Sequence, residues 1–262
     1  MQNPETYYYG QGRVSIALRD AITGALGKWR WIGDVSALSI KLSVDKVQHS
    51  ESYSGQLGLA RSFPAKKTAT LDMTVNQIDT DNLQLGLFGT VLAKAGGTAA
   101  AEALPAGLVA GDVFYLANPG VASVVITDST ATPKTLVPGT DYVVEDASFG
   151  RCRLVSAGTY TQPFKAAYIY GATKSVGMFT AAQPNVAVRY EGINLAEGNA
   201  PVLVDLYKVA TDPLQELALI SSGNDVTGMQ VSGGILLDSS KPATGPLGQY
   251  GAISQITQAV SP

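Results

Sequence analysis

The sequence predicts a mainly β protein, and three observations lead to that prediction. Residues 37–47 and 68–78 alternate apolar and polar side chains with a period of two, as strands do when one face is buried and the other is wet. Glycine, proline and asparagine turn signals recur at short spacing through residues 111–170. Helical spacing of apolar residues is clear in only one short stretch, just after residue 78.

The first elements in the chain are expected to form a hairpin. Residues 13–18 read as a strand, a glycine-containing turn follows at 23–27, and residues 28–35 read as its partner strand. The partner carries both tryptophans, Trp29 and Trp31, which we expect at the core or at an interface.

The alternating segments 37–47 and 68–78 are expected to pair as a long hairpin. Their apolar residues face a core, and their polar face is made of Ser39, Lys41, Ser43, Asp45, Thr68, Thr70, Asp72 and Thr74. The connection, 48–67, is expected to be a polar loop of about 20 residues, a length that in compact domains is typical of functional loops or of loops ordered by a partner.

A short helix is expected after this hairpin. Residues 79–81 offer N-cap oxygens, and Leu83, Leu87 and Phe88 follow at helical spacing. Gly89 is placed as the C-terminal cap. Residues 94–108, rich in alanine and glycine, read as a linker that is partly helical.

The middle of the chain differs from its flanks. Turn signals separate short expected strands at 113–116, 123–127, 142–145, 151–155 and 166–170, which indicates a small all-β unit.

Long strands resume beyond residue 171. Residues 185–195 and 201–209 are expected to form a second long hairpin, and 226–237 another strand. Residues 214–220 fit a strand or a helix equally well, and the tail 241–262 is rich in glycine, proline and serine. We therefore expect one discontinuous domain, 1–95 with 172–262, and an inserted all-β module with its linker at 96–171.

Composition limits the chemistry. The net charge of −3 disfavours a conventional DNA-binding surface, and a charged fraction of only 15% suits a surface that copies of the chain cover. A single cysteine, Cys152, excludes an internal disulfide framework and reads as a small core residue. A single histidine, His49, excludes zinc sites with several histidines, and pairing it with Ser50 in a loop would not hold catalytic geometry.

No other catalytic, cofactor or metal motif is expected, so the chain is not expected to be an enzyme and no cofactor is assigned. Residues 7–9, three tyrosines, read either as an N-terminal arm or as a stacking platform for sugars or bases. The first twelve residues lack the features of a signal peptide, and no apolar run is long enough to span a bilayer, so we expect the protein to fold in the cytoplasm.

Residues 31–89 resemble the core of tail tube (major tail) proteins of long-tailed, non-contractile bacteriophages. The resemblance rests on the string WIGDVSALSIKLSVDKVQHSESYSG, the approach RSFPAKK, the strand ATLDMTV and the helix that ends at LQLGLFG. It covers about a quarter of the chain.

The resemblance implies a β-sandwich or half-barrel flanked by a short helix. It also implies a structural virion protein: six copies form a ring, and stacked rings form a hollow tube for ejection of the genome into the host. The implied partners are other copies, the tape-measure protein and double-stranded DNA in the lumen, and the tail terminator and tail-tip proteins at the ends. The implied location is the virion tail, assembled in the host cytoplasm, with no membrane contact.

Within that reading, the polar face of the long hairpin is expected to line the lumen, where hydroxyl groups without a basic stripe let a polyanion slide. Both long hairpins are expected to offer free edges that pair with neighbouring copies. The loop is expected to contact the adjacent ring through His49, Glu51, Tyr53, Arg61, Lys66 and Lys67.

Three alternatives remain open at this point. One is a tube subunit of a secretion system or pyocin-like machine, which would share the fold. Another is a glycan-binding surface module that uses residues 7–9 or the insert. The third is that the polar face is simply the solvent side of a sandwich, the default for antiparallel sheets.

Overall fold

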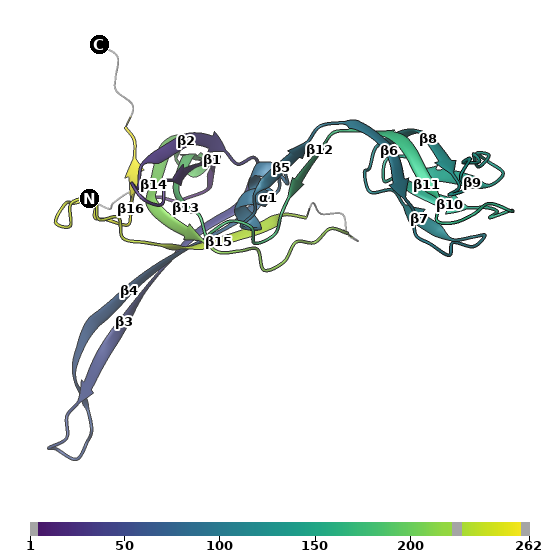
Figure 1. Ribbon diagram of the computed structural model, residues 1–262. Helices are drawn as coiled ribbons and strands as arrows, with labels where there is room; N and C mark the ends of the chain where they lie inside the picture. The colour runs from purple at the N-terminus through teal and green to yellow at the C-terminus, as the bar shows by residue number, and fades with distance from the viewer. Residues whose placement is uncertain (1–4, 222–226, 258–262) are drawn as a thin grey trace, which may run out of the picture. The chain divides into compact units, whose positions relative to one another are not determined.

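The structure, a computed structural model, describes residues 5–221 and 227–257. Within these residues the protein is mainly β, with antiparallel sheets and a single short α-helix (Figure 1). The chain divides into two compact units, Met1–Thr90 with Val176–Pro262, and Val91–Ser175. The insert expected at 96–171 lies wholly within the second unit.

The first unit is built on one eight-stranded antiparallel sheet, ordered β2-β1-β13-β14-β15-β4-β3, with β16 pairing with β14. Its strands are β1 (Gly10–Arg19), β2 (Leu26–Trp31), β3 (Val35–Ser50), β4 (Leu59–Val75), β13 (Asn185–Asn194), β14 (Ala200–Thr211), β15 (Met229–Ile235) and β16 (Gly251–Gln255). A 3-10 turn, η1 (Leu195–Glu197), joins β13 to β14.

One buried core unites strands that are far apart in the order of this sheet. Ile16 on β1, Val188 on β13, Leu206 on β14 and Leu71 on β4 belong to the same buried cluster. A flat sheet could not bring β1 and β4 into one cluster, so the sheet curls around its apolar face.

The helix α1 (Thr80–Gly86) begins where the sequence predicts, because the Asp79 side chain accepts a hydrogen bond from the Asn82 backbone N–H at 2.7 Å. Its buried residue Leu85 joins the same core. The predicted C-terminal cap is wrong: Leu87 is the cap, and Phe88, with φ of 49°, makes the left-handed turn that we assigned to Gly89. Gly89 is instead needed for space, because an added Cβ would lie 2.2 Å from the Gly177 carbonyl oxygen.

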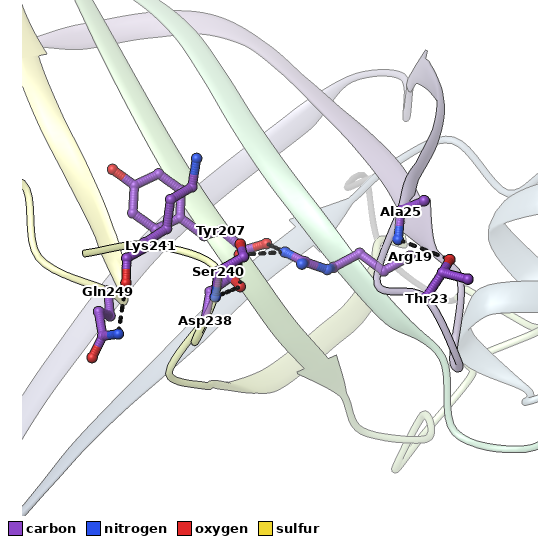
Figure 2. A network of polar contacts seen from close by, with 8 residues as sticks. All are labelled: Arg19, Thr23, Ala25, Tyr207, Asp238, Ser240, Lys241 and Gln249. Atoms are coloured by element: carbon purple, nitrogen blue, oxygen red, sulfur yellow. Dashed lines mark hydrogen bonds and ion pairs between the residues drawn. The ribbon is translucent and has the colours of Figure 1, made fainter. Parts of the chain in front are cut away.

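A buried ion pair fastens the segment after β15 to the sheet (Figure 2). Arg19 on β1 donates from Nη1 to the carbonyl oxygen of Tyr207 at 2.5 Å and to Asp238 Oδ2 at 2.7 Å. Ser240 donates its backbone N–H and its hydroxyl to the other oxygen of Asp238. Burial raises the pKa of Asp238, but the hydrogen bonds from Arg19 and Ser240 outweigh it and lower the pKa to about 2.

The second unit is a small sandwich with a core of its own. Its strands are β5 (Val91–Lys94), β6 (Gly97–Ala103), β7 (Val113–Tyr115), β8 (Val121–Thr127), β9 (Tyr142–Asp146), β10 (Arg151–Leu154), β11 (Lys165–Tyr170) and β12 (Thr173–Val176). The sheets β7-β10-β9 and β6-β11-β8 share one buried cluster that includes Cys152 and Tyr168, and β5 pairs with β12. Burial, with the nearby Glu145 carboxylate, raises the pKa of the Cys152 thiol to about 11.

Several expected elements are corrected. The linker at 94–108 contains strand β6, because pairing with β11 overrides the helix propensity of its alanines. Residues 214–220 form neither strand nor helix, and the tail contains strand β16. Val226, the expected start of a strand, lies outside the described residues, and the strand there begins at Met229.

The tryptophans are not in the core. Trp29 and Trp31 are 41% and 49% exposed, and each ring carries a guanidinium, from Arg189 at 5.4 Å and from Arg13 at 4.8 Å. In the part of the chain that is described, no helix has the length and apolar character needed to cross a bilayer.

Candidate assembly surface

The long hairpin of β3 and β4 has two halves with different surroundings. From Ala69 to Val75, β4 pairs with β3 on one edge and with β15 on the other. Its apolar residues there are buried, Leu71 and Met73 being each 2% exposed. Beyond this stretch, residues 43–68 pair only with each other within the described chain, and we call this segment the arm.

The polar row predicted from the sequence exists on one face of the hairpin. Opposite partners are Ser39 with Asp72, Lys41 with Thr70, and Ser43 with Thr68. Asp45 and Thr74 extend the row at its two ends, opposite Lys66 and Ala37. None of the eight side chains is buried.

Lys41 does not make this row basic. Its Nζ lies 2.9 Å from Asp72 Oδ2, on the diagonal neighbour across the two strands. With Asp45, the three charges of the row sum to +1 − 2 = −1.

The expected 20-residue loop is wrong. The β3–β4 ladder continues to Ser50 and Leu59, so the connection is only residues 51–58. A β-bulge between Asp45 and Lys46 shifts the register by one residue on β4. We placed the start of the second strand at residue 68, where the regular alternation of apolar and polar residues begins. A bulge interrupts that alternation without ending the strand.

Most of the expected loop residues therefore lie in strands. His49 is on β3 opposite Arg61 on β4, and Lys66 and Lys67 are on β4 beside the bulge. All four side chains are exposed.

Glu51 organises the turn at the tip of the arm. Its carboxylate accepts hydrogen bonds from the backbone N–H groups of Tyr53 at 3.0 Å and Ser54 at 2.8 Å, and from the Ser54 hydroxyl. These bonds, led by the Ser54 hydroxyl, lower the pKa of Glu51 to about 2. Tyr53 is 90% exposed at the tip.

The arm exposes apolar side chains on both faces, whereas a hairpin that stays in water has no need of them. Val47 and Phe63, opposite each other beyond the bulge, are 48% and 50% exposed. The other exposed apolar side chains of the arm are Val44, Tyr53, Leu57 and Leu59. Exposed apolar side chains gathered on one segment of a monomer indicate an interaction surface.

The arm is also basic, whereas the rest of the chain is acidic. Residues 43–68 contain four Lys or Arg and two Asp or Glu, a net charge of 4 − 2 = +2. The whole chain carries −3, so the remainder carries −3 − 2 = −5.

The second long hairpin does not offer free edges, which corrects our expectation. β13 pairs with β1 along its whole length, and β14 pairs on its other side with β16 and β15. Backbone groups that are already paired cannot accept a strand from another copy. Of the two long hairpins, only β3–β4 has edges for such pairing among the described residues.

The sequence analysis missed a groove of about 790 Å³ beside the base of the hairpin. Its walls are the first half of β1 and residues 34–40, and its lining includes Tyr8, Gln11, Asp34, Leu38, Tyr190 and Ile253. Gly10, Gln11 and Gly12 form the start of β1, before the strand that we expected at 13–18. The signal that would have found the groove is the pair of glycines two residues apart, which in a strand indicates close approach of another group.

The N-terminal tyrosines lie along the turn after β13. Asn194 accepts a hydrogen bond from the Tyr9 N–H and donates one to the Tyr7 carbonyl oxygen, each at 2.8 Å. These hydrogen bonds fit the interpretation of residues 7–9 as an N-terminal segment that anchors to the rest of the chain. Each of the three tyrosines stays more than 60% exposed.

The described residues show no group of three His, Cys, Asp or Glu side chains placed to hold a metal ion. His49 is exposed on the arm, and Cys152 is buried in the second unit.

One family model matches residues 7–254 of the chain and is described as "Protein of unknown function UCP028589". The search of curated proteins finds no match.

Proposed function

The chain belongs to this family of unknown function, and from its assembly surface we propose that it is a structural virion protein, the subunit of the tail tube of a long-tailed, non-contractile bacteriophage. The observation that carries the proposal is the arm, with unpaired strand edges and exposed apolar side chains. A chain that kept such an edge exposed would aggregate, so the arm requires a regular partner, and other copies of the chain are the simplest one. The tail-tube resemblance of residues 31–89 includes the whole arm.

The polar row suits the wall of a conduit for DNA. Hydroxyl groups dominate it, Lys41 is paired with Asp72, and its charges sum to −1, which Lys66 opposite Asp45 brings to 0. Double-stranded DNA binds where cations release its counterions, so a row of this kind lets the genome and the tape-measure protein pass without holding them. In this proposal the tail terminator and tail-tip proteins close the two ends of the tube in the virion.

The width of the lumen limits how many strands each copy contributes to the wall of the tube. Twelve strands, two from each of six copies, would leave roughly 14 Å inside after side chains are subtracted, which is too narrow for a duplex about 20 Å across. Twenty-four strands would leave roughly 38 Å. Because β13–β14 has no free edge, the additional strands cannot come from it as a second separate hairpin, so the wall would have to include strands that already pair with β4 in the same sheet.

Electron microscopy of the concentrated protein tests the proposal. We expect hollow rods of stacked sixfold rings, with a bore wider than a DNA duplex. A chain that stays monomeric at high concentration, as judged by size-exclusion chromatography, would contradict the proposal.

A matched variant isolates the arm. Replacing residues 52–58 with Asn-Gly shortens the tip but keeps a turn that a two-stranded hairpin accepts. We expect a folded monomer, with an unchanged far-ultraviolet circular dichroism spectrum, that no longer forms rods. Normal rods from this variant would show that the tip is not part of the assembly contact.

A further inference from the structure

The groove at the base of the hairpin is bounded by two unpaired strand edges. β2 pairs with β1 only from Ser15 onward, and the Ile32 N–H donates to the Val14 carbonyl oxygen at 3.1 Å, so residues 10–13 have no strand on that side within the described chain. Across the groove, residues 35–40 of β3 pair only with β4. A groove between two open edges fits an extended segment of chain.

Glycines and tyrosines shape the floor of this groove. At Gly12 an added Cβ would lie 2.3 Å from the Glu191 carbonyl oxygen and 2.8 Å from the Tyr190 ring. At Gly10 it would lie 2.5 Å from the Tyr8 hydroxyl. Two aromatic rings thus lie over bare backbone, and beside them Leu38 and Ile40 are only partly buried. Aromatic and aliphatic walls of this kind favour an apolar anchor.

The arm matches the groove in shape, polarity and charge. It is an extended two-stranded ribbon that carries the exposed pair Val47 and Phe63. It has a net charge of +2, while the groove contains Asp34, an exposed residue whose carboxylate accepts one hydrogen bond, from Asn76, and belongs to the part of the chain with a net charge of −5. Complementary charges of this kind steer association and determine its orientation.

The arm cannot occupy the groove of its own chain. The ladder between β3 and β4 runs without a break in pairing from Val35 to Ser50, apart from bulges. Strands rise about 3.3 Å per residue, so Val47 and its partner Phe63 lie roughly 23 Å beyond Ile40. A paired ribbon cannot fold back over that length, so its partner must be another copy.

We infer that the groove receives the arm of a second copy, with Phe63 as the apolar anchor near Tyr8 and Tyr190 and with the basic side chains of the arm facing Asp34. This inference rests on the proposed self-assembly and names the surface that the arm contacts. Arm and groove are different surfaces of one chain, so the contact is heterologous and propagates from copy to copy into rings or filaments.

Site-specific cross-linking tests the contact directly. Two single variants are prepared, Ser62→Cys, next to Phe63 on the arm, and Gln11→Cys in the groove, and they are mixed under conditions in which the protein assembles. The native Cys152 is buried, so it does not compete for a bismaleimide reagent. We expect a covalent dimer that forms in the mixture and not in either variant alone.

Ile22→Cys is the matched control, because Ile22 is 95% exposed on the turn between β1 and β2 and lies outside the groove. Mixed with Ser62→Cys, it is expected to give at least tenfold less cross-linked dimer. Equal yields from Gln11→Cys and Ile22→Cys would overturn the inference, because cross-linking would then report random collisions.

A second measurement separates this inference from the proposed function. Phe63→Ser removes the anchor, and the loss of a central aromatic anchor is expected to weaken assembly at least about tenfold. Rods that form at the wild-type concentration with Phe63→Ser would overturn the inference and leave the proposed function standing. Absence of any assembly by the wild-type chain would overturn both.

Discussion

Both long hairpins of the first unit were predicted from the sequence, and they differ in what surrounds them. β13–β14 lies in the middle of the sheet, with β1 on one side and β15 and β16 on the other, and its residues Val186, Val188 and Val209 are at most 2% exposed. β3–β4 ends the sheet, and its distal half, the arm, exposes both faces and both edges.

This difference shows which property of a strand the alternation of apolar and polar residues predicts. A period of two says that successive side chains point to opposite faces of a strand. It says nothing about whether the edges of that strand are paired, because edge pairing involves backbone groups that every residue has. Assembly by strand pairing depends on edges, so only the sheet order distinguishes the structural hairpin from the one we propose for assembly.

A matched pair of charged substitutions should give the largest difference in the free energy of unfolding between the two hairpins. Val188→Asp places an unpaired carboxylate in the core of the central hairpin and is expected to cost more than about 4 kcal/mol, enough to unfold the first unit. Val44→Asp makes the same change on the arm, where Val44 is 44% exposed, and is expected to change stability by less than about 1 kcal/mol. Urea denaturation followed by circular dichroism measures both, and similar losses would mean that the arm packs like the core.

Two leucine-to-alanine substitutions should show where the buried part of the β3–β4 hairpin ends. Leu71 and Leu42 lie on the same apolar face, but Leu71 is 2% exposed and Leu42 is 79% exposed. Leu71→Ala is expected to cost about 2–5 kcal/mol, because it leaves a cavity in the core. Leu42→Ala is expected to cost less than about 0.5 kcal/mol in the monomer, as urea midpoints will show. If Leu42→Ala lowers the free energy of unfolding more at high protein concentration than at low concentration, Leu42 lies in the contact between copies.

Two carboxylates with lowered pKa values offer a smaller and pH-dependent comparison. Asp238, 6% exposed beside Arg19, fastens the central part of the sheet, whereas Glu51 organises the exposed tip, and the pKa of each is about 2. A lowered pKa in the folded state adds stability above the unfolded pKa of about 4, and this stability is lost as pH falls through the folded pKa.

Asp238→Asn is therefore expected to cost about 1–2 kcal/mol at pH 7, with the difference from wild type shrinking between about pH 4 and pH 2. Glu51→Gln is expected to change the urea midpoint less than Asp238→Asn does, at pH 7 and at pH 2, because the tip is exposed and solvent screens the hydrogen bonds of Glu51. A pH-independent cost for Asp238→Asn would show that the carboxylate acts through packing and not through its charge.

Five strands of the second unit, β7 to β11, were the most predictable part of the molecule. Gly120, Gly139 and Gly150 all adopt positive φ in the turns assigned to them, and strong turn residues of this kind terminate strands locally. The start of α1 was equally local, since Asp79 caps its own helix three residues away. Of the candidate site, the eight residues of the polar row were found because they share one face of two regular strands.

The parts that could not be predicted depend on distant contacts. The bulge at Asp45 hid nine residues of β4, and pairing with β11 turned the alanines of β6 into a strand. The groove joins residues 8–14, 34–40, 190 and 253, which no local pattern connects.

The sequence by itself determined the β class, the faces of the hairpins, the capped helix and the inserted module, because side-chain periodicity and turn chemistry act within a few residues. Only the tertiary structure decided which hairpin lies in the centre of the sheet, how far the arm extends and where the groove opens. Those features depend on which backbone edges find partners, and that choice is made by segments far apart in the chain.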